Sequence, residues 1–167
     1  MTELTCSAPD RFRMVDVAFI LTKSDRPFTA ASVAEHASTF KLPLVVSNET
    51  TPDQATELSS FSLNDGRPGL LVSTFLPVPH PDTASISSGP DAPTRDHVAL
   101  VRSHIVLVGF GIEGNSEARE ALMHQFAATV ALSTDAVAAM LGSGTDFVRH
   151  EIFIESAHEI TKRNDLS

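Results

Sequence analysis

Residues 104–133 read HIVLVGFGIEGNSEAREALMHQFAATVALS, an apolar run followed by a glycine-rich turn and a long alanine-rich segment. The run at 104–110 is rich in β-branched side chains, which predicts a buried strand. The segment 116–133 has apolar residues at helical spacing, which predicts an amphipathic helix. The apolar residues of this face are Leu122, Phe126 and Val130. Together these segments predict a strand–turn–helix unit.

Working outward from this unit, the chain alternates further strand and helix signals. Apolar runs predict strands at residues 15–22, 42–47, 58–63, 69–76 and 136–141. Asn64-Asp65-Gly66 supplies the positive φ that a tight hairpin needs between two of these strands. Helical patterns predict one helix capped by Thr29 and ending near residue 39, and another at residues 94–103. The segment 147–162 shows both strand and helix features, and we interpret it as a helix.

This order of elements, β-α-β-β-β-α-β-α-β-α, predicts the fold class α+β. A hairpin combined with strand–helix units indicates a mixed, mostly antiparallel sheet with the helices mainly on one face. We expect a single domain at residues 15–162, preceded by a flexible N-terminal tail at 1–14 and followed by a C-terminal tail at 163–167. The proline- and serine-rich segment 77–93 is expected to be an irregular loop.

Composition narrows the classes of function. The chain has 167 residues and a net charge of −9, so it repels phosphate backbones and anionic lipids. Nucleic acid and membranes are therefore poor candidate partners. The one cysteine, Cys6, excludes an internal disulfide and favours a reducing compartment. The early apolar run at 17–21 is too short to cross a bilayer, and charged residues before it argue against a signal peptide, so we expect a cytoplasmic protein.

Gly109, Gly111 and Gly114 form a G-x-G-x-x-G motif between the predicted strand and helix. In a dinucleotide-binding unit such glycines let the backbone approach a pyrophosphate at the helix N-terminus. Against a nucleotide site, Glu113 places a negative charge in the loop, and the preceding hairpin is not a β-α-β unit. We therefore favour a plain strand-to-helix connection and keep nucleotide binding as the alternative.

A second group of candidate residues combines histidines and carboxylates. His80 and Asp82 lie in the proline-rich segment, and His97 and His104 follow it. Imidazole and carboxylate groups are ligands of zinc and non-haem iron. The chain has no H-x-x-x-H or H-E-x-x-H pair, and a histidine between two prolines is more often a solvent-facing loop residue. Metal-dependent hydrolysis through these four residues is therefore the weakest hypothesis.

The runs FLPVPHPD at residues 75–82 and VRSHIVLV at 101–108, followed by the alanine-rich helix, form a recognisable succession. It resembles a bacterial family catalogued as a domain of unknown function, whose members have a Pro-x-Pro turn after a strand, a His-Ile-Val strand and a closing helix–strand–helix. The resemblance implies a fold for residues 15–160 and no chemistry. Some relatives belong to secretion or toxin–immunity settings.

No catalytic constellation such as G-x-S-x-G occurs in the chain. We therefore expect a non-enzymatic protein-binding or accessory module without a cofactor, for example an immunity protein or inhibitor. The acidic residues are spread evenly along the chain, which favours a basic protein partner. A homodimer stays open as an alternative. The runner-up is a small-molecule or nucleotide-binding domain that uses the turn at residues 109–114, with residues 77–93 as a lid.

Overall fold

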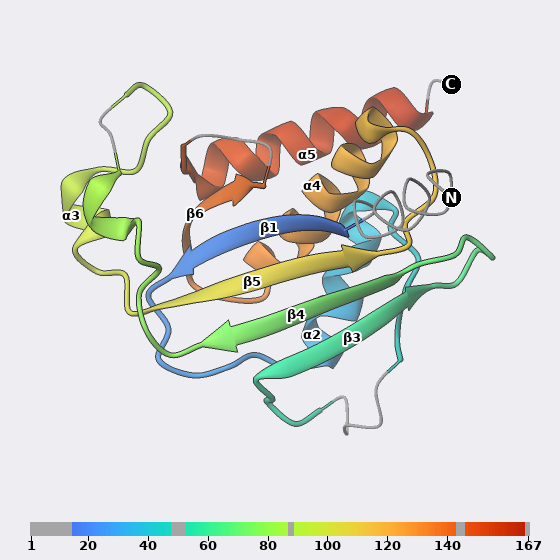
Figure 1. The fold of residues 1–167 in the computed structure, drawn as a ribbon, viewed down its shortest axis with the longest axis horizontal. Coiled ribbons are helices and arrows are strands. Elements are labelled where there is room, and N and C mark those ends of the chain that lie inside the picture. Colours follow the sequence, from blue (N-terminus) through green and yellow to red (C-terminus); the bar gives the residue numbers. More distant parts are fainter. Residues whose placement is uncertain (1–14, 48–52, 87–88, 143–145, 166–167) are drawn as a thin grey trace, which may run out of the picture.

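Seven strands form one antiparallel sheet in the computed structural model, which describes residues 15–47, 53–86, 89–142 and 146–165 (Figure 1). Every neighbouring pair of strands is antiparallel, so the predicted α+β class is confirmed. In spatial order the strands are β2 (Leu44–Val46), β3 (Leu58–Leu63), β4 (Leu70–Leu76), β5 (Ser103–Phe110), β1 (Val15–Thr22), β6 (Ala136–Leu141) and β7 (Val148–Arg149).

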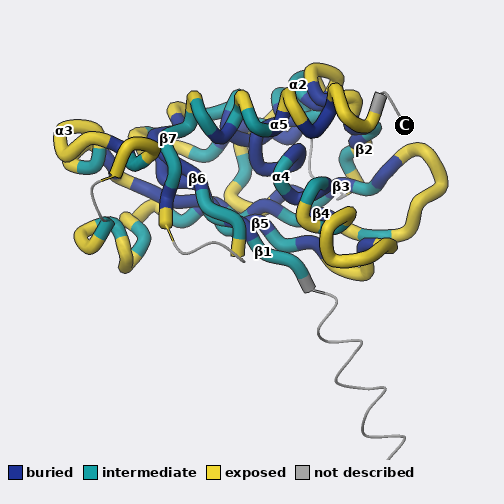
Figure 2. Tube along the Cα trace, turned by 90° about the horizontal axis from the view of Figure 1, so that it is seen from above, coloured by how far each residue is buried: buried dark blue, intermediate teal, exposed yellow. Residues whose placement is uncertain are grey.

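The three longer helices all lie on the same side of the sheet (Figures 1 and 2). They are α2 (Ala30–His36), α4 (Ser116–Leu132) and α5 (His150–Asp165). The short helix α3 (Arg95–Val98) lies at one end of the sheet. The described residues also form two 3-10 turns, η1 (Ala37–Phe40) and η2 (Thr83–Ser85). Among the described residues, no helix has both the length and the apolar character needed to cross a lipid bilayer.

Local signals account for most of these elements. Thr29 caps α2 as predicted, because its Oγ1 accepts a hydrogen bond from Ser32 N at 3.1 Å. The helix predicted at 147–162 is confirmed from His150 onward as α5, which extends to Asp165, whereas Val148–Arg149 form strand β7. The helix predicted at 94–103 is wrong in length, because only the four residues of α3 are helical. Arg102 N donates to Thr22 O at 2.9 Å, so pairing with β1 begins where the helix was expected to continue.

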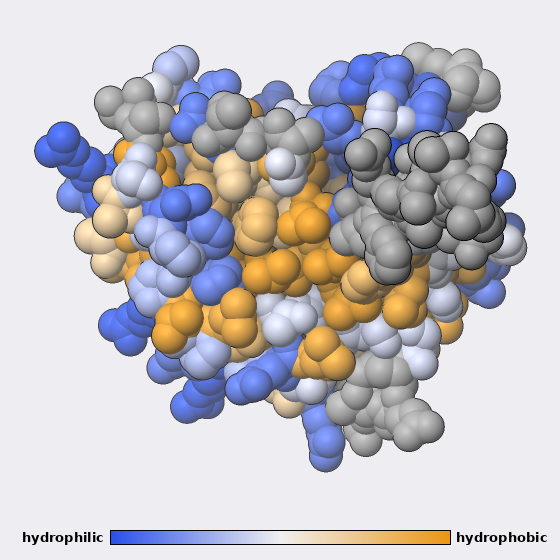
Figure 3. All heavy atoms as spheres, in the orientation of Figure 1, coloured by the Kyte–Doolittle hydropathy of each residue, from blue (hydrophilic) through white to orange (hydrophobic). Residues whose placement is uncertain are grey.

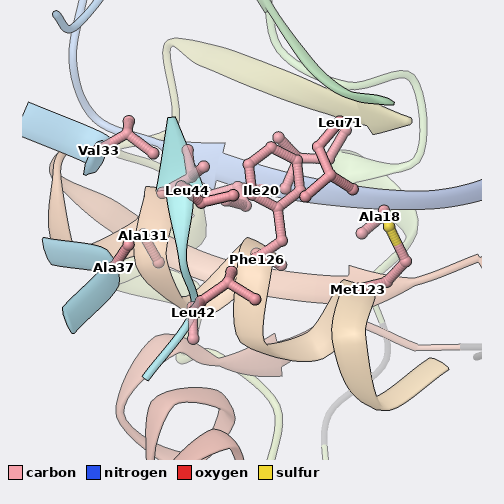
Figure 4. Packing of buried hydrophobic residues seen from close by; sticks show 14 of the residues in the cluster. Ala18, Ile20, Val33, Ala37, Leu42, Leu44, Leu71, Met123, Phe126 and Ala131 are labelled. Carbon is pink, nitrogen blue, oxygen red and sulfur yellow. The ribbon is translucent and has the colours of Figure 1, made fainter. Parts of the chain in front are cut away.

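The main core lies between the sheet and the helices (Figure 4). Phe126, on α4, is fully buried and meets Phe61 of β3 edge to face, with ring centroids 5.8 Å apart. The side chains that the sheet turns toward the helices are also fully buried, including Ile20, Ile105 and Leu71. Burial of this kind is the dominant favourable term in folding.

One buried amide links three helical elements behind this core. Gln125 of α4 donates through Nε2 to Phe40 O in η1 at 3.2 Å and to Thr161 Oγ1 in α5 at 3.1 Å. Its side chain is almost fully buried, so both bonds form away from water. Because an unsatisfied buried amide is costly, this side chain favours one arrangement of α4, η1 and α5.

Candidate functional site

Opposite the helices, the sheet exposes a second apolar surface that no described helix covers (Figures 1 and 2). We call this surface the open face. Its members follow from the strand register, since side chains on paired strands alternate between the two faces of a sheet. They are Val17, Leu58, Ser60, Leu70, Val72, Thr74, Val106, Val108 and Phe110, and none of them is charged.

The centre of the open face is a row of valines that runs across three strands. Val108 of β5 pairs with Val17 of β1 on one side and with Val72 of β4 on the other. At the end of β5, Phe110 pairs with Leu70, and the two are 45% and 38% exposed. Figure 3 shows apolar residues gathered across the middle of this face, with hydrophilic residues at its edges.

One end of the same sheet face is closed by a small second core. Its buried members are Leu21, Val101, Val137, Ala138 and Phe147, which come from β1, β6 and the segments before β5 and β7. The segment that follows β4 adds His80, whose ring meets Phe19 at a centroid distance of 5.0 Å. The open face therefore begins where this second core ends.

The structure brings together His80 and His104, two of the predicted metal ligands, as rings in contact. Their centroids lie 5.1 Å apart at an interplanar angle of 82°. Each imidazole Nδ1 already has a backbone partner: His104 Nδ1 lies 2.7 Å from Val78 O, and His80 Nδ1 accepts from Asp82 N at 3.0 Å. Burial and, secondarily, the neighbouring His104 lower the pKa of His80. The two histidines therefore pack as a ring contact in which both Nδ1 atoms have backbone partners.

The other two predicted ligands lie at the surface. The Asp82 side chain is 68% exposed, and its Oδ2 lies 4.0 Å from His80 Nδ1. His97 is exposed on α3. Within the described parts of the chain, no three histidine, cysteine or carboxylate side chains are grouped in a way that could hold a metal ion. Metal-dependent hydrolysis stays a prediction without a ligand set in the described structure.

The three glycines of the G-x-G-x-x-G motif meet backbone and packing requirements of this fold. Gly109 lies within β5, and a Cβ there would be 2.9 Å from Met123 Sδ and 3.2 Å from Ile112 Cγ1. Gly111 and Gly114 have φ values of 62° and 116°, which favour glycine. The turn thus places Ile112, which is 2% exposed, in the main core.

The start of α4 is also poorly suited to a phosphate. Asn115 caps the helix, since its Oδ1 accepts from Ala118 N at 2.8 Å and thereby uses a donor that an anion would need. Glu113 and Glu117 place exposed carboxylates on either side. Strand β5 is flanked by antiparallel strands, whereas a dinucleotide unit needs a parallel crossover. These features favour the plain connection, and nucleotide binding stays an untested prediction.

An acidic cavity of about 320 Å³ lies on the helix side, between β6, α4 and α5. Its lining includes the carboxylates of Asp91, Glu120 and Asp146 and the imidazole of His124. Burial lowers the pKa of His124, whose Nε2 lies 3.0 Å from Phe153 O. The carboxylates give the cavity a negative charge, which favours a positively charged group of a partner.

No known family model, no curated protein and no solved structure matches this chain. The feature that sequence reasoning missed is the open face. Its signal was present in the runs at 15–22 and 104–110, which are apolar at nearly every position instead of alternating. In a sheet with helices on one side, such runs leave apolar side chains on the other side as well.

Proposed function

We propose that this protein is a non-enzymatic protein-binding module and that its contact surface is the open face. The observation that carries the proposal is an uncharged apolar surface on four strands that no described element covers. Large exposed apolar patches on otherwise polar proteins mark interaction sites, because leaving them in water is unfavourable. The reducing compartment favoured by a single cysteine agrees with a cytoplasmic setting, and the family resemblance with a bacterial one.

The shape of the open face favours a protein over a small ligand. Small molecules bind in concave pockets that enclose most of their surface, whereas protein partners bind to broad surfaces. The open face is broad, and the valines at its centre lose little side-chain entropy when a partner packs against them. Ser60 and Thr74 add hydroxyl groups that can form hydrogen bonds to a partner.

An immunity or inhibitor role against a basic protein is the electrostatic form of this proposal. It is supported by the acidic cavity and by the exposed carboxylates of Glu151, Glu155 and Glu159 on α5. Such a complex would weaken as salt screens the attraction. A complex made through the open face would not weaken as salt rises, so ionic strength separates the two forms.

The test is affinity capture with three baits: the wild type, Val108→Lys and Leu100→Lys. Val108 is at the centre of the open face, and Leu100 is a 50% exposed leucine outside it, so the second variant is a matched control. We expect the wild type and Leu100→Lys to retain a protein that Val108→Lys loses. Retention that survives Val108→Lys but falls steeply with salt would contradict the open face as the contact surface.

A further inference from the structure

We infer that the occupant of the open face is a second copy of this chain, placed sheet against sheet with two-fold symmetry. This inference rests on the proposed function, because it names the partner for the same surface. In such a pair the two sheets lie about 10 Å apart and their side chains interdigitate. Each copy then covers the open face of the other.

The chemistry of the open face suits an identical partner. In a two-fold interface each patch contacts its own copy, so a patch with a charge near the axis would bury like charges together. The open face has no charged side chain, and its centre is the row Val17, Val108 and Val72. Valine side chains can pack against the valines of a second copy, and this contact buries no unpaired charge.

The size of the open face agrees with a small interface. Its members lie on four strands about 4.8 Å apart and extend over about five residues at about 3.3 Å per residue, which gives a footprint of about 19 Å by about 17 Å. Two such footprints remove about 650 Å² of flat area from water, and projecting side chains add accessible area to it. An interface of this size is at the low end of the range for protein complexes, where weak and transient complexes lie.

Edge-to-edge pairing of sheets is the other route to a dimer, and the sheet does not favour it. The two edge strands are β2, with three residues, and β7, with two. Very short edge strands present few free backbone donors and acceptors, which is a common way to avoid edge pairing. The face of the sheet is therefore the surface available for association.

The net charge of the chain predicts how the affinity of the dimer depends on salt. Each copy carries a net charge of −9, so two copies repel one another at low ionic strength. Added salt screens that repulsion while leaving the apolar contact intact, so the dimer should strengthen as salt rises. A basic partner would show the opposite dependence.

The experiment is sedimentation equilibrium of the full chain between roughly 1 μM and roughly 1 mM, the range over which weak complexes dissociate. We expect the mass to rise from 17.9 kDa toward twice that value, at lower concentration when salt is raised. Lysine at Val108 would be buried without a counter-charge, so Val108→Lys should weaken the dimer by at least about 100-fold. Leu100→Lys should leave it unchanged.

A second face variant, Phe110→Lys, guards against loss of folding, because Phe110 is already 45% exposed at the end of β5. It should also weaken the dimer while circular dichroism stays that of the wild type. A single-copy mass at every concentration would overturn the second copy, as would a dimer indifferent to both variants. A monomer whose captured partner is lost in Val108→Lys would overturn the second copy while the proposed function stands.

Discussion

Replacing Gly109 by alanine tests whether the glycine motif serves packing or ligand binding. The added Cβ would lie 2.9 Å from Met123 Sδ and 3.2 Å from Ile112 Cγ1, and both of these side chains are almost fully buried. Overfilling a packed core costs about 1–3 kcal/mol, and alanine recovers about 0.4–1 kcal/mol by restricting the unfolded chain. We therefore expect Gly109→Ala to lower the free energy of unfolding by about 1–2 kcal/mol.

Urea unfolding followed by far-ultraviolet circular dichroism measures this difference, since the chain has no tryptophan or tyrosine. The midpoint should fall with an unchanged slope, as it does when stability alone changes. Gly111→Ala is the comparison: it has no atom within 4 Å of the new Cβ, and its φ of 62° alone costs about 1–2 kcal/mol. Wild-type stability in Gly109→Ala, together with a lost nucleotide-induced shift in melting temperature, would refute the packing interpretation.

Three further changes test other parts of the account by the same measurement. Asn115→Ala removes the cap of α4 and should lower the free energy of unfolding by about 1 kcal/mol, whereas Asn115→Asp should keep most of that stability. Equal unfolding midpoints for the wild type and Asn115→Ala would show that the cap is not formed. Gln125→Ala leaves Phe40 O without its amide donor and should cost about 1–3 kcal/mol, and an unchanged midpoint would contradict the buried network. Burial holds the pKa of His80 below the ordinary 6.5. As pH falls through 6.5, His80 therefore binds a proton in the unfolded chain before it does so in the folded chain, and the free energy of unfolding decreases on acidification. His80→Phe keeps the ring contacts without the proton uptake, so its stability should fall less below pH 6.5; parallel pH curves for the two proteins would refute this.

Local patterns predicted most of the fold. The strand–turn–helix unit at 104–133 matches β5 and α4 closely, because apolar spacing and a capping residue act within a few residues of each other. The length of α3 and the existence of β7 escaped prediction for the opposite reason. Both depend on pairing between distant segments: Arg102 with Thr22 for the end of the helix, and Ala139 with Val148 for the short strand.

The candidate site was harder to predict, because it is a face of the sheet that no described helix covers. The order of elements predicted the helices mainly on one face, and α2, α4 and α5 do share one side. A continuous apolar run, however, indicates burial on both faces of a strand, so it does not by itself predict a bare face. The histidines illustrate the same limit. Residue types suggested metal ligands, whereas the fold turns His80 and His104 toward each other as ring contacts and places His97 at the surface.

The most direct test of a second copy on the open face is methyl NMR of the full chain at increasing protein concentration. The methyl signals of Val72, Val106 and Val108 on the open face should shift and broaden, because these groups enter the interface. Those of Val33 of α2 and Val130 of α4, which are fully buried, should stay in place. Concentration-dependent shifts confined to α4 and α5, or no shift at the open-face valines, would contradict the account.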